Sequence, residues 1–378
     1  LYMNQKNIFS NEMKEISIFV YDLDLGGTEK VMVNLANFLS LHNCNVTFVM
    51  VGSNTYLKKE LLSEVSVKAF NKKHISSSFI DLVRYIRSKK VDCFISNVWP
   101  LTIFTILAGI FKKGFCKKVF LIEHCHLGRE FSSHSLMFRI FQKLSIFFLY
   151  RFSSKIIAVS EGVREDLCSN KGVGRERITV IHNPVNVTFS NLEYDKSTIQ
   201  KWRSFSGAKF ISVGTLKEQK NYPYLLDALL VLKRQGFEFK QLILGEGPTK
   251  SSLANKISNL GLENSVYLAG SVDQPINLIK DADTFILSSK FEGFGLVIVE
   301  ALAAGTMVVS TDCESGPAEI LKDGKYGFLA PTDNAKKFAE VIYQGYLNQI
   351  NSSKLIERAK EYTIEVAGPK YLELINKL

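Results

Sequence analysis

Short apolar runs alternate with longer stretches of helical apolar spacing along most of the chain. The first half has strand-length runs at residues 16–21, 46–51, 93–98, 119–123 and 156–160, and a helical pattern over 28–41. The second half has such runs at 210–213, 241–244, 266–268, 284–287 and 307–310, with helical patterns over 225–232, 253–260 and 296–304. This βαβ rhythm predicts an α/β fold built on parallel sheets.

The length of the chain and one polar stretch predict two domains. The chain has 378 residues, and an ordinary domain has about 100 to 200. Residues 186–207 have no clear apolar period and are the predicted linker. The expected domains are therefore 1–187 and 188–361, each Rossmann-like. Because open parallel sheets bind ligands at the carboxyl ends of their strands, functional motifs are expected in post-strand loops that face a shared cleft.

Composition indicates a folded protein of the cell interior. Hydrophobic residues make up 46% of the chain and charged residues 22%, which excludes a disordered or fibrous protein. The longest apolar run, residues 101–111, is too short for a membrane-spanning helix, which needs about 20 residues. No signal-peptide pattern is found at the start, and the six cysteines are scattered without a CxxC pair. A reducing, cytoplasmic environment is expected.

The net charge of +10 is concentrated in the first half, where residues 1–185 hold 25 Lys and Arg against 15 Asp and Glu. The basic residues around the apolar-rich stretch 135–152 are Lys112, Lys113, Lys117, Lys118, Arg139, Lys143 and Arg151. This combination is typical of contact with anionic lipid headgroups, and a solvated basic face beside a core helix is the alternative. Nucleic acid is not expected as a partner, because no recognition motif with interleaved aromatic residues accompanies the charge.

The loop after the first predicted strand has two glycines at the start of a helix. Gly26 and Gly27 can let a charged ligand approach the backbone and the helix N-terminus, and a plain tight turn is the alternative. The dinucleotide fingerprint G-x-G-x-x-G and its later acidic residue are absent, so an NAD-binding protein is not supported. Asp22 and Asp24 resemble the D-x-D pair with which another class of sugar transferases holds a divalent cation.

His124 lies at the end of the predicted strand 119–123, where its side chain would point into the cleft. A structural histidine is the alternative interpretation. Metal ligation is not supported, because no further Cys or His set at ligand spacing accompanies it.

Two lysines follow the first predicted strand of the second half. Lys217 and Lys220 lie three positions apart before a helix, and ammonium groups at this place suit phosphate oxygens. Solvated lysines at a helix start are the alternative. Gly245-Glu-Gly247 follows a later strand and fits neither the dinucleotide nor the P-loop pattern, so it is interpreted as a tight turn that borders the ligand.

The stretch Phe291-Glu-Gly-Phe-Gly-Leu-Val-Ile-Val-Glu300 places glycines between a strand and an apolar helix. The N–H groups expected to start the helix and attract an anion belong to Gly295, Leu296 and Val297. Carboxylates beside a phosphate are repelled, so Glu292 and Glu300 are interpreted as acceptors from neutral hydroxyls while lysines offset the phosphate charge. Hydroxyls and phosphate together indicate a nucleotide-sugar.

The chain resembles glycosyltransferase family 4 over nearly its whole length. The resemblance rests on Glu292-x7-Glu300, the Gly26-Gly27 turn, His124 after its strand, Lys220, and Ser315-Gly-Pro-Ala-Glu-Ile320. It implies the GT-B fold, in which two Rossmann-like, doubly wound domains face a central cleft and a C-terminal helix, here 362–378, crosses back to the first domain. It also implies a retaining sugar transfer, for which neither metal nor cofactor is expected.

The resemblance implies a role for each matching residue. Gly26 and Gly27 would approach the donor diphosphate, His124 would contact the transferred sugar, Lys220 would bind phosphate, Glu292 would hold sugar hydroxyls and Glu300 the ribose hydroxyls. Thr215 occupies the place of an arginine that is common in the family, and Lys217 is the candidate substitute for it at the donor.

The expected donor is a nucleotide-sugar that carries a hexose or N-acetylhexosamine, and family habit favours UDP. The expected acceptor is a lipid-linked oligosaccharide, O-antigen, capsule or lipopolysaccharide glycan at the inner face of a bacterial cytoplasmic membrane. Two alternatives are a nucleotide-sugar epimerase of the same fold and a nucleotide-sugar-binding subunit that has lost catalysis.

Overall fold

The computed structural model describes residues 13–24, 26–186, 189 and 196–378. The chain divides into two compact units. The first unit holds the residues up to Ile122 together with Leu149–Ile156 and Lys370–Leu378, and the second holds Glu123–Phe148 and Ile157–Pro369. The predicted domain boundary at residues 187 and 188 lies outside the described residues, so the domain limits stay a prediction.

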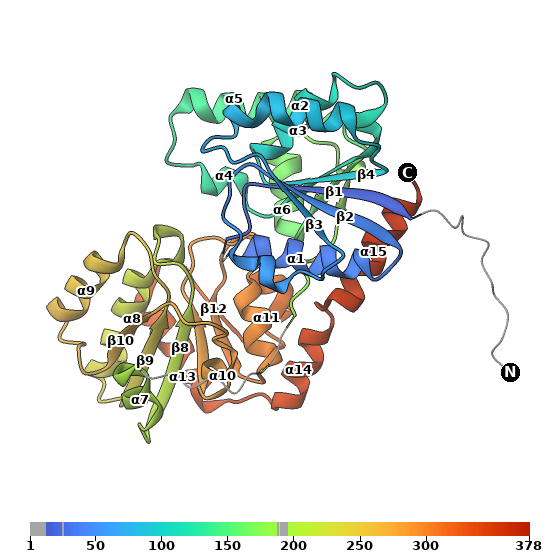
Figure 1. Cartoon of the computed structure of the whole chain (residues 1–378). Coiled ribbons are helices and arrows are strands. Elements are labelled where there is room, and N and C mark those ends of the chain that lie inside the picture. Colours follow the sequence, from blue (N-terminus) through green and yellow to red (C-terminus); the bar gives the residue numbers. More distant parts are fainter. Residues whose placement is uncertain (1–12, 25, 187–188, 190–195) are drawn as a thin grey trace, which may run out of the picture. The chain divides into compact units, whose positions relative to one another are not determined.

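The first sheet has seven strands in the order β3-β2-β1-β4-β5-β6-β7 in the part of the chain that the structure describes (Figure 1). These are β1 (Lys14–Val20), β2 (Cys44–Met50), β3 (Ser66–Ala69), β4 (Cys93–Asn97), β5 (Val119–Glu123), β6 (Lys155–Ala158) and β7 (Ile178–Val180). The α-helices in this stretch are α1 (Gly27–Ser40), α2 (Phe79–Ser88), α3 (Leu101–Gly109), α4 (Leu127–Glu130), α5 (Leu136–Leu149) and α6 (Glu161–Glu165). Strands β4 and β5 are buried along their whole length, as expected for central strands of a parallel sheet.

The second sheet has six parallel strands in the order β10-β9-β8-β11-β12-β13 among the described residues. These are β8 (Ala208–Val213), β9 (Phe239–Leu244), β10 (Val266–Gly270), β11 (Thr284–Leu287), β12 (Met307–Thr311) and β13 (Phe328–Ala330). The helices are α7 (Ser197–Arg203), α8 (Tyr222–Arg234), α9 (Lys250–Asn259), α10 (Ile276–Lys280), α11 (Leu296–Ala303), α12 (Pro317–Leu321), α13 (Ala335–Leu347), α14 (Ser352–Lys360) and α15 (Ile364–Asn376). The predicted α/β fold with two Rossmann-like sheets is confirmed.

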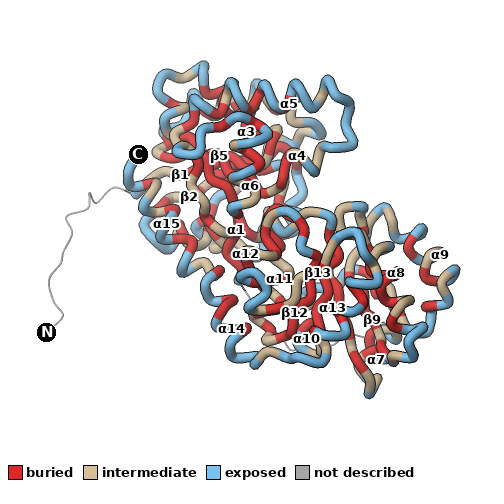
Figure 2. The backbone as a smooth tube through the Cα atoms, turned by 180° about the vertical axis from the view of Figure 1, so that it is seen from behind, coloured by how far each residue is buried: buried red, intermediate tan, exposed pale blue. Residues whose placement is uncertain are grey.

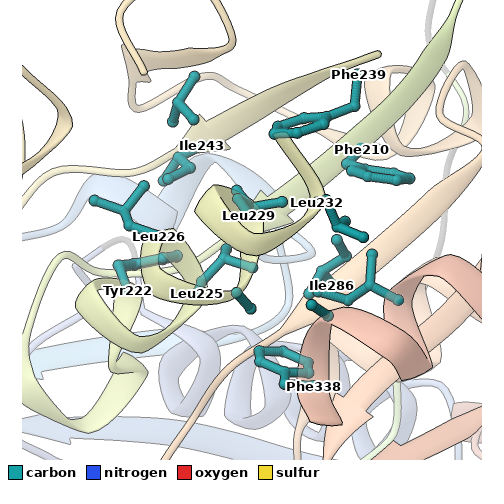
Figure 3. Packing of buried hydrophobic residues seen from close by; sticks show 14 of the residues in the cluster. Phe210, Tyr222, Leu225, Leu226, Leu229, Leu232, Phe239, Ile243, Ile286 and Phe338 are labelled. Carbon is teal, nitrogen blue, oxygen red and sulfur yellow. The ribbon is translucent and has the colours of Figure 1, made fainter. Parts of the chain in front are cut away.

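Helix α8 packs its apolar stripe on the second sheet (Figure 3). Leu225, Leu229 and Leu232 recur at helical spacing and are buried in one cluster with Phe210 of β8 and Phe338 of α13. Burying a side chain of this size stabilises the fold by about 1.5–3 kcal/mol. The same packing fixes the start of α8, and thereby the loop between β8 and α8 that carries Lys220.

The prediction that residues 186–207 form a linker is wrong for its second half. Helix α7 occupies Ser197–Arg203, and its Ile199 and Trp202 are buried. Trp202 Nε1 donates hydrogen bonds to the carbonyl oxygens of Phe210 and Lys240 at 3.0 and 3.2 Å. Two apolar residues in one short helix are too few to produce a readable period, so the pattern missed it.

Two strands of the sheet edges also escaped the pattern. Strand β3 alternates between exposed and half-buried residues, and β13 spans only Phe328–Ala330. Figure 2 shows the burial along the chain, and it shows helix α5 exposed over most of its length. No helix in the described ranges is both long and apolar enough to cross a membrane.

Candidate active site

Lys220 and Glu292 form a nearly buried ion pair beyond the carboxyl ends of β8 and β11, which are neighbours in the second sheet. Lys220 Nζ donates to Glu292 Oε1 at 2.7 Å, and the two side chains are 13% and 8% exposed. Ser289 Oγ donates to the same oxygen at 2.6 Å. An ammonium group has three donors and a carboxylate about four acceptor positions, so both groups can bind a further partner.

Hydrogen bonds fasten the two loops that carry this pair. Ser288 Oγ donates to the carbonyl oxygen of Lys220 at 2.7 Å. Gln219 Nε2 donates to the carbonyl oxygen of Phe291 at 2.9 Å, and the N–H of Lys290 donates to the carbonyl oxygen of Gln219 at 2.8 Å. The position of the lysine is therefore set by its own main chain as well as by the carboxylate.

The glycines of the 291–295 loop are required by close main-chain contacts. A Cβ added to Gly293 would lie 1.8 Å from the carbonyl oxygen of His124, and one added to Gly316 would lie 1.7 Å from that of Phe294. Gly295 has φ of 97°, a left-handed conformation that favours glycine, and it caps the start of α11. Ser160 Oγ donates to the carbonyl oxygen of Gly293 at 2.7 Å.

His124 lies against this loop with an unsatisfied ring. The residue is 8% exposed, and both ring nitrogens are buried without a hydrogen-bond partner, as is Asn183 Oδ1. Burial lowers the pKa of His124 to about 3, and the nearby Asn183 side chain opposes part of that shift. The ring is thus neutral at pH 7, with one donor and one acceptor nitrogen. Ser315 Oγ is a further buried polar atom without a partner.

The loops after β8 and β9 run beside each other, and the loop after β8 carries Lys217 as well as Lys220. The N–H of Leu216 donates to the carbonyl oxygen of Glu246 at 2.8 Å, and a Cβ on Gly245 would lie 2.1 Å from the carbonyl oxygen of Gly214. The tight turn predicted at Gly245-Glu-Gly247 therefore packs on the lysine loop. Lys217 Nζ lies 3.8 Å from Glu130 Oε1 of α4, and Thr215 is exposed.

Three of the predicted residues, His124, Lys220 and Glu292, are joined by contacts at the loop before α11. His124 contacts the loop that holds Glu292, and Glu292 holds Lys220. Leu296 and Val297 begin α11 after Gly295, and Glu300 lies half-buried in its second turn. As in any α-helix, the first N–H groups have no acceptor within the helix.

Gly26 and Gly27 belong to the first unit, so their relation to Lys220 stays a prediction. Gly26 precedes α1, and a Cβ on it would lie 2.0 Å from Glu29 Oε2. Burial raises the pKa of Glu29, the bond from its own N–H lowers it, and Asp22 and Asp24 raise it further. The missing side chain at Gly26 thus leaves space that the Glu29 carboxylate occupies at the helix start.

Sequence reasoning missed three polar residues of the site, namely Ser160, Asn183 and Ser289. Ser160 accepts from the N–H of Val163 at 3.1 Å as the cap of α6, besides donating to Gly293. A serine at the last position of the predicted strand 156–160 is a readable signal for the cap of a following helix. No comparable signal marks Asn183 or Ser289, because their roles arise only from the folded contacts.

The described residues contain no group of three or more His, Cys, Asp or Glu side chains placed to hold a metal ion. In the D-x-D pair, the N–H of Asp24 donates to Asp22 Oδ1 at 3.1 Å. Burial raises the pKa of Asp22, while the bond from Asp24 lowers it. The first carboxylate is thus engaged in a local turn.

The buried ring of His124 should make stability depend on pH. Its folded pKa of about 3 lies below the ordinary value of 6.5, so the unfolded chain binds the proton more readily. The contribution is fully present above pH 6.5 and is lost as the pH falls toward 3, with a slope of up to about 1.4 kcal/mol per pH unit. Denaturant unfolding between about pH 4 and 7 measures it.

His124→Gln should flatten this slope, and His74→Gln, at an exposed histidine, should leave it unchanged. Equal slopes for the wild type and His124→Gln would contradict a buried neutral ring.

Two sequence families match the chain. Residues 25–189 match the family described as Glycosyltransferase Family 4, and residues 197–362 match Glycosyl transferases group 1. The two matches cover the segments that hold the Gly26-Gly27 turn, His124, Lys220 and Glu292.

Relatives and solved structures align along almost the whole chain. The N-acetylgalactosamine-N,N'-diacetylbacillosaminyl-diphospho-undecaprenol 4-alpha-N-acetylgalactosaminyltransferase of Campylobacter jejuni is 28% identical over 351 residues, which cover 91% of this chain and 92% of its own. The amylovoran biosynthesis glycosyltransferase AmsD of Erwinia amylovora is 26% identical over 362 residues, which cover 93% of this chain and 96% of its own. The structure of Anabaena Alr3699/HepE in complex with UDP and glucose has a TM-score of 0.78 at 20% identity, and the match covers 97% of this chain and 100% of that one. The two matches together and the confirmed GT-B type of fold identify the chain as a glycosyltransferase, with Glycosyltransferase Family 4 matched in its first half and Glycosyl transferases group 1 in its second.

Proposed function

We propose that the protein transfers a hexose or N-acetylhexosamine from a UDP-sugar to a glycan acceptor with retention of anomeric configuration. The observation that carries this proposal is the neutral, buried His124, whose unpartnered nitrogens lie against the loop that holds the Lys220–Glu292 pair. A sugar hydroxyl both donates and accepts hydrogen bonds, so it satisfies a buried donor or acceptor that otherwise costs about 1–3 kcal/mol.

The donor phosphates are proposed to bind the remaining N–H groups of Lys220 and the start of α11 at Gly295, Leu296 and Val297. The ammonium group of Lys220 carries a full positive charge and the helix start a partial one, and both attract an anion. Lys217, two residues after Thr215, would supply a second ammonium where many relatives have arginine. Glu292 would accept from sugar hydroxyls and Glu300 from the ribose, and Gly26 and Gly27 would admit the diphosphate on the side of α1.

The names of the relatives support the donor and acceptor classes. The Anabaena structure contains UDP and glucose. The Campylobacter relative is named for transfer to a diphospho-undecaprenol-linked sugar, and the Erwinia relative for amylovoran biosynthesis. We therefore favour UDP as the nucleotide and a lipid-linked or surface glycan as the acceptor, at the inner face of a bacterial membrane.

The proposed reaction needs no nucleophile from the protein. The bond between the anomeric carbon and the UDP oxygen breaks, and an acceptor hydroxyl forms the new bond from the same face. The departing phosphate oxygen takes the hydroxyl proton, and Lys220 and the helix start stabilise the charge that develops on it. Preorganised donors of this kind lower the barrier because they are oriented before the charge appears.

Replacing Lys220 should separate catalysis from stability. Lys220→Met removes a donor to the leaving phosphate, so turnover should fall about 10²-fold or more. It also leaves Glu292 buried without its cation, which costs about 3–5 kcal/mol of unfolding free energy. The double variant Lys220→Met/Glu292→Gln should recover most of that stability and none of the activity. Steady-state kinetics and denaturant unfolding measure the two effects.

Lys256→Met is the matched control, because Lys256 pairs with Asp227 at 2.7 Å on the surface, where the side chains are 30% and 45% exposed. It should change stability by less than about 1 kcal/mol and leave turnover unchanged. Normal activity in Lys220→Met would contradict the proposed phosphate contact. UDP binding without any UDP release would instead indicate a binding subunit, and a product formed without an acceptor would indicate an epimerase.

Transfer is expected to continue in EDTA, because ammonium and main-chain groups are proposed to neutralise the phosphates. The measurement is turnover with a UDP-sugar before and after chelation. Loss of activity that a divalent cation restores would replace this mechanism with one that uses Asp22 and Asp24.

Helix α5 supports the proposed contact with an anionic membrane surface. Its buried residues are Gln142, Ser145 and Ile146, whereas Met137, Phe141 and Leu144 are 82%, 61% and 48% exposed. Most apolar side chains of this helix therefore face outward, whereas the apolar face of a helix usually packs on the core. Exposed apolar residues beside cations favour the interfacial region of an anionic bilayer.

Vesicle sedimentation tests this contact. The protein should bind anionic vesicles at low salt and bind them less at high salt, because salt screens the charges. Phe141→Ser/Leu144→Ser should weaken binding, whereas Leu347→Ser, at a position 54% exposed on α13, should not. Binding that is absent or insensitive to salt would point to a soluble acceptor.

A further inference from the structure

A pocket of about 600 Å³ lies between α4, α5 and residues 170–171, within the second unit. Its polar lining includes His126, Arg129, Arg139, Gln142, Lys143 and Lys171, together with Glu314. Its volume is that of a small-molecule site. None of these residues belongs to the donor contacts proposed above.

The cations of this pocket differ in how they are compensated. Arg129 forms two hydrogen bonds to the Glu314 carboxylate, one of them from Nε to Oε2 at 2.7 Å. His126 lies between Asp166 and Glu314, with nitrogen to oxygen distances of 3.5 and 3.3 Å. Within the described residues, Arg139 and Lys143 have no carboxylate at ion-pair distance, and both are exposed at the pocket.

Lys171 is the third cation that has no carboxylate at ion-pair distance among the described residues, and it is buried. The residue is 5% exposed, and its Nζ donates to Gln142 Oε1 at 2.7 Å. Burial lowers the pKa of Lys171, Arg139 and Lys143 lower it further, and Asp166 and Glu123 oppose the shift. Three cations that repel one another around one pocket cost free energy unless an anion binds between them.

Gln142 gives a second, independent sign of a ligand. The residue is 1% exposed, and its Nε2 is buried without a hydrogen-bond partner at the pocket wall. A buried amide donor of this kind needs an acceptor oxygen. An anion with several oxygens, such as a phosphate or diphosphate, satisfies the amide and the three cations together.

The apolar residues of α5 indicate what the anion is attached to. Leu136 and Ile140 line the same pocket, and Met137, Phe141 and Leu144 continue the apolar surface outside it. An anionic group joined to a long apolar chain matches both surfaces.

We infer that this pocket binds the diphosphate of a polyprenyl-diphosphate-linked acceptor, with the chain in the bilayer beneath α5. The inference rests on the proposed function and adds the site that recognises the acceptor. It separates two anion sites: Lys220 and α11 take the donor, and Arg139, Lys143 and Lys171 take the acceptor.

Binding of inorganic pyrophosphate to the full chain at saturating UDP tests the pocket. Arg139→Gln and Lys143→Gln change exposed residues, so folding should be preserved, and each should weaken pyrophosphate binding about tenfold. UDP affinity, measured in parallel, should not change in these variants. Lys336→Gln, at an exposed residue of α13, is the matched control and should bind pyrophosphate as the wild type does.

Vesicles test the lipid. Those doped with a polyprenyl diphosphate should bind the wild type about tenfold more tightly than vesicles of equal charge made with phosphatidylglycerol, and Lys143→Gln should lose that preference. Pyrophosphate binding that is absent, or equal in all variants, overturns the pocket. If the variants lose pyrophosphate binding but the wild type shows no preference for vesicles with the polyprenyl diphosphate, the lipid acceptor is overturned. Failure of the wild type to bind UDP would overturn the proposed donor site instead, whatever the result with pyrophosphate.

Discussion

The ion pair between Lys220 and Glu292 is the constraint on which the site depends. An unpaired charge at such a depth costs several kcal/mol, so neither residue is stable there alone. Their common position requires β8 and β11 to be neighbours, and it requires the loops after these strands to be fastened by Ser288 and Gln219. The parallel order of the sheet thus delivers two opposite charges to one edge, each with hydrogen-bonding capacity left for a ligand.

Main-chain contacts complete the site around that pair. Gly293 and Gly316 permit approaches that no side chain would allow, and Gly295 supplies the left-handed residue that starts α11. The result is a loop whose carbonyl and N–H groups are fixed before any ligand binds. His124 is buried beside this loop, and this burial keeps its ring neutral. In a site of this kind, the groups need little reorganisation when charge develops in a reaction, so the free-energy cost is small.

The sequence predicted those parts of the structure that depend on local pattern. Strand runs and post-strand glycines located both sheets, and the stretch 291–300 placed Glu292 in the loop before a helix and Glu300 within that helix. Helix α7 was missed because two apolar residues make no period, and Asn183 because its proximity to His124 arises only in the folded chain. Residues 135–152 were recognised as basic and apolar. The inward direction of Gln142 could not be read, because apolar residues lie all around this helix and give no single apolar face.

A crystal structure of the protein with an intact UDP-sugar tests directly whether Lys220, His124 and Glu292 bind one donor. We expect a β-phosphate oxygen within about 3.2 Å of Lys220 Nζ, with a hydroxyl of the sugar hydrogen-bonded to the His124 ring and another to Glu292. A nucleotide bound elsewhere, with the ring of His124 and the Lys220 ammonium both out of its reach, would contradict it.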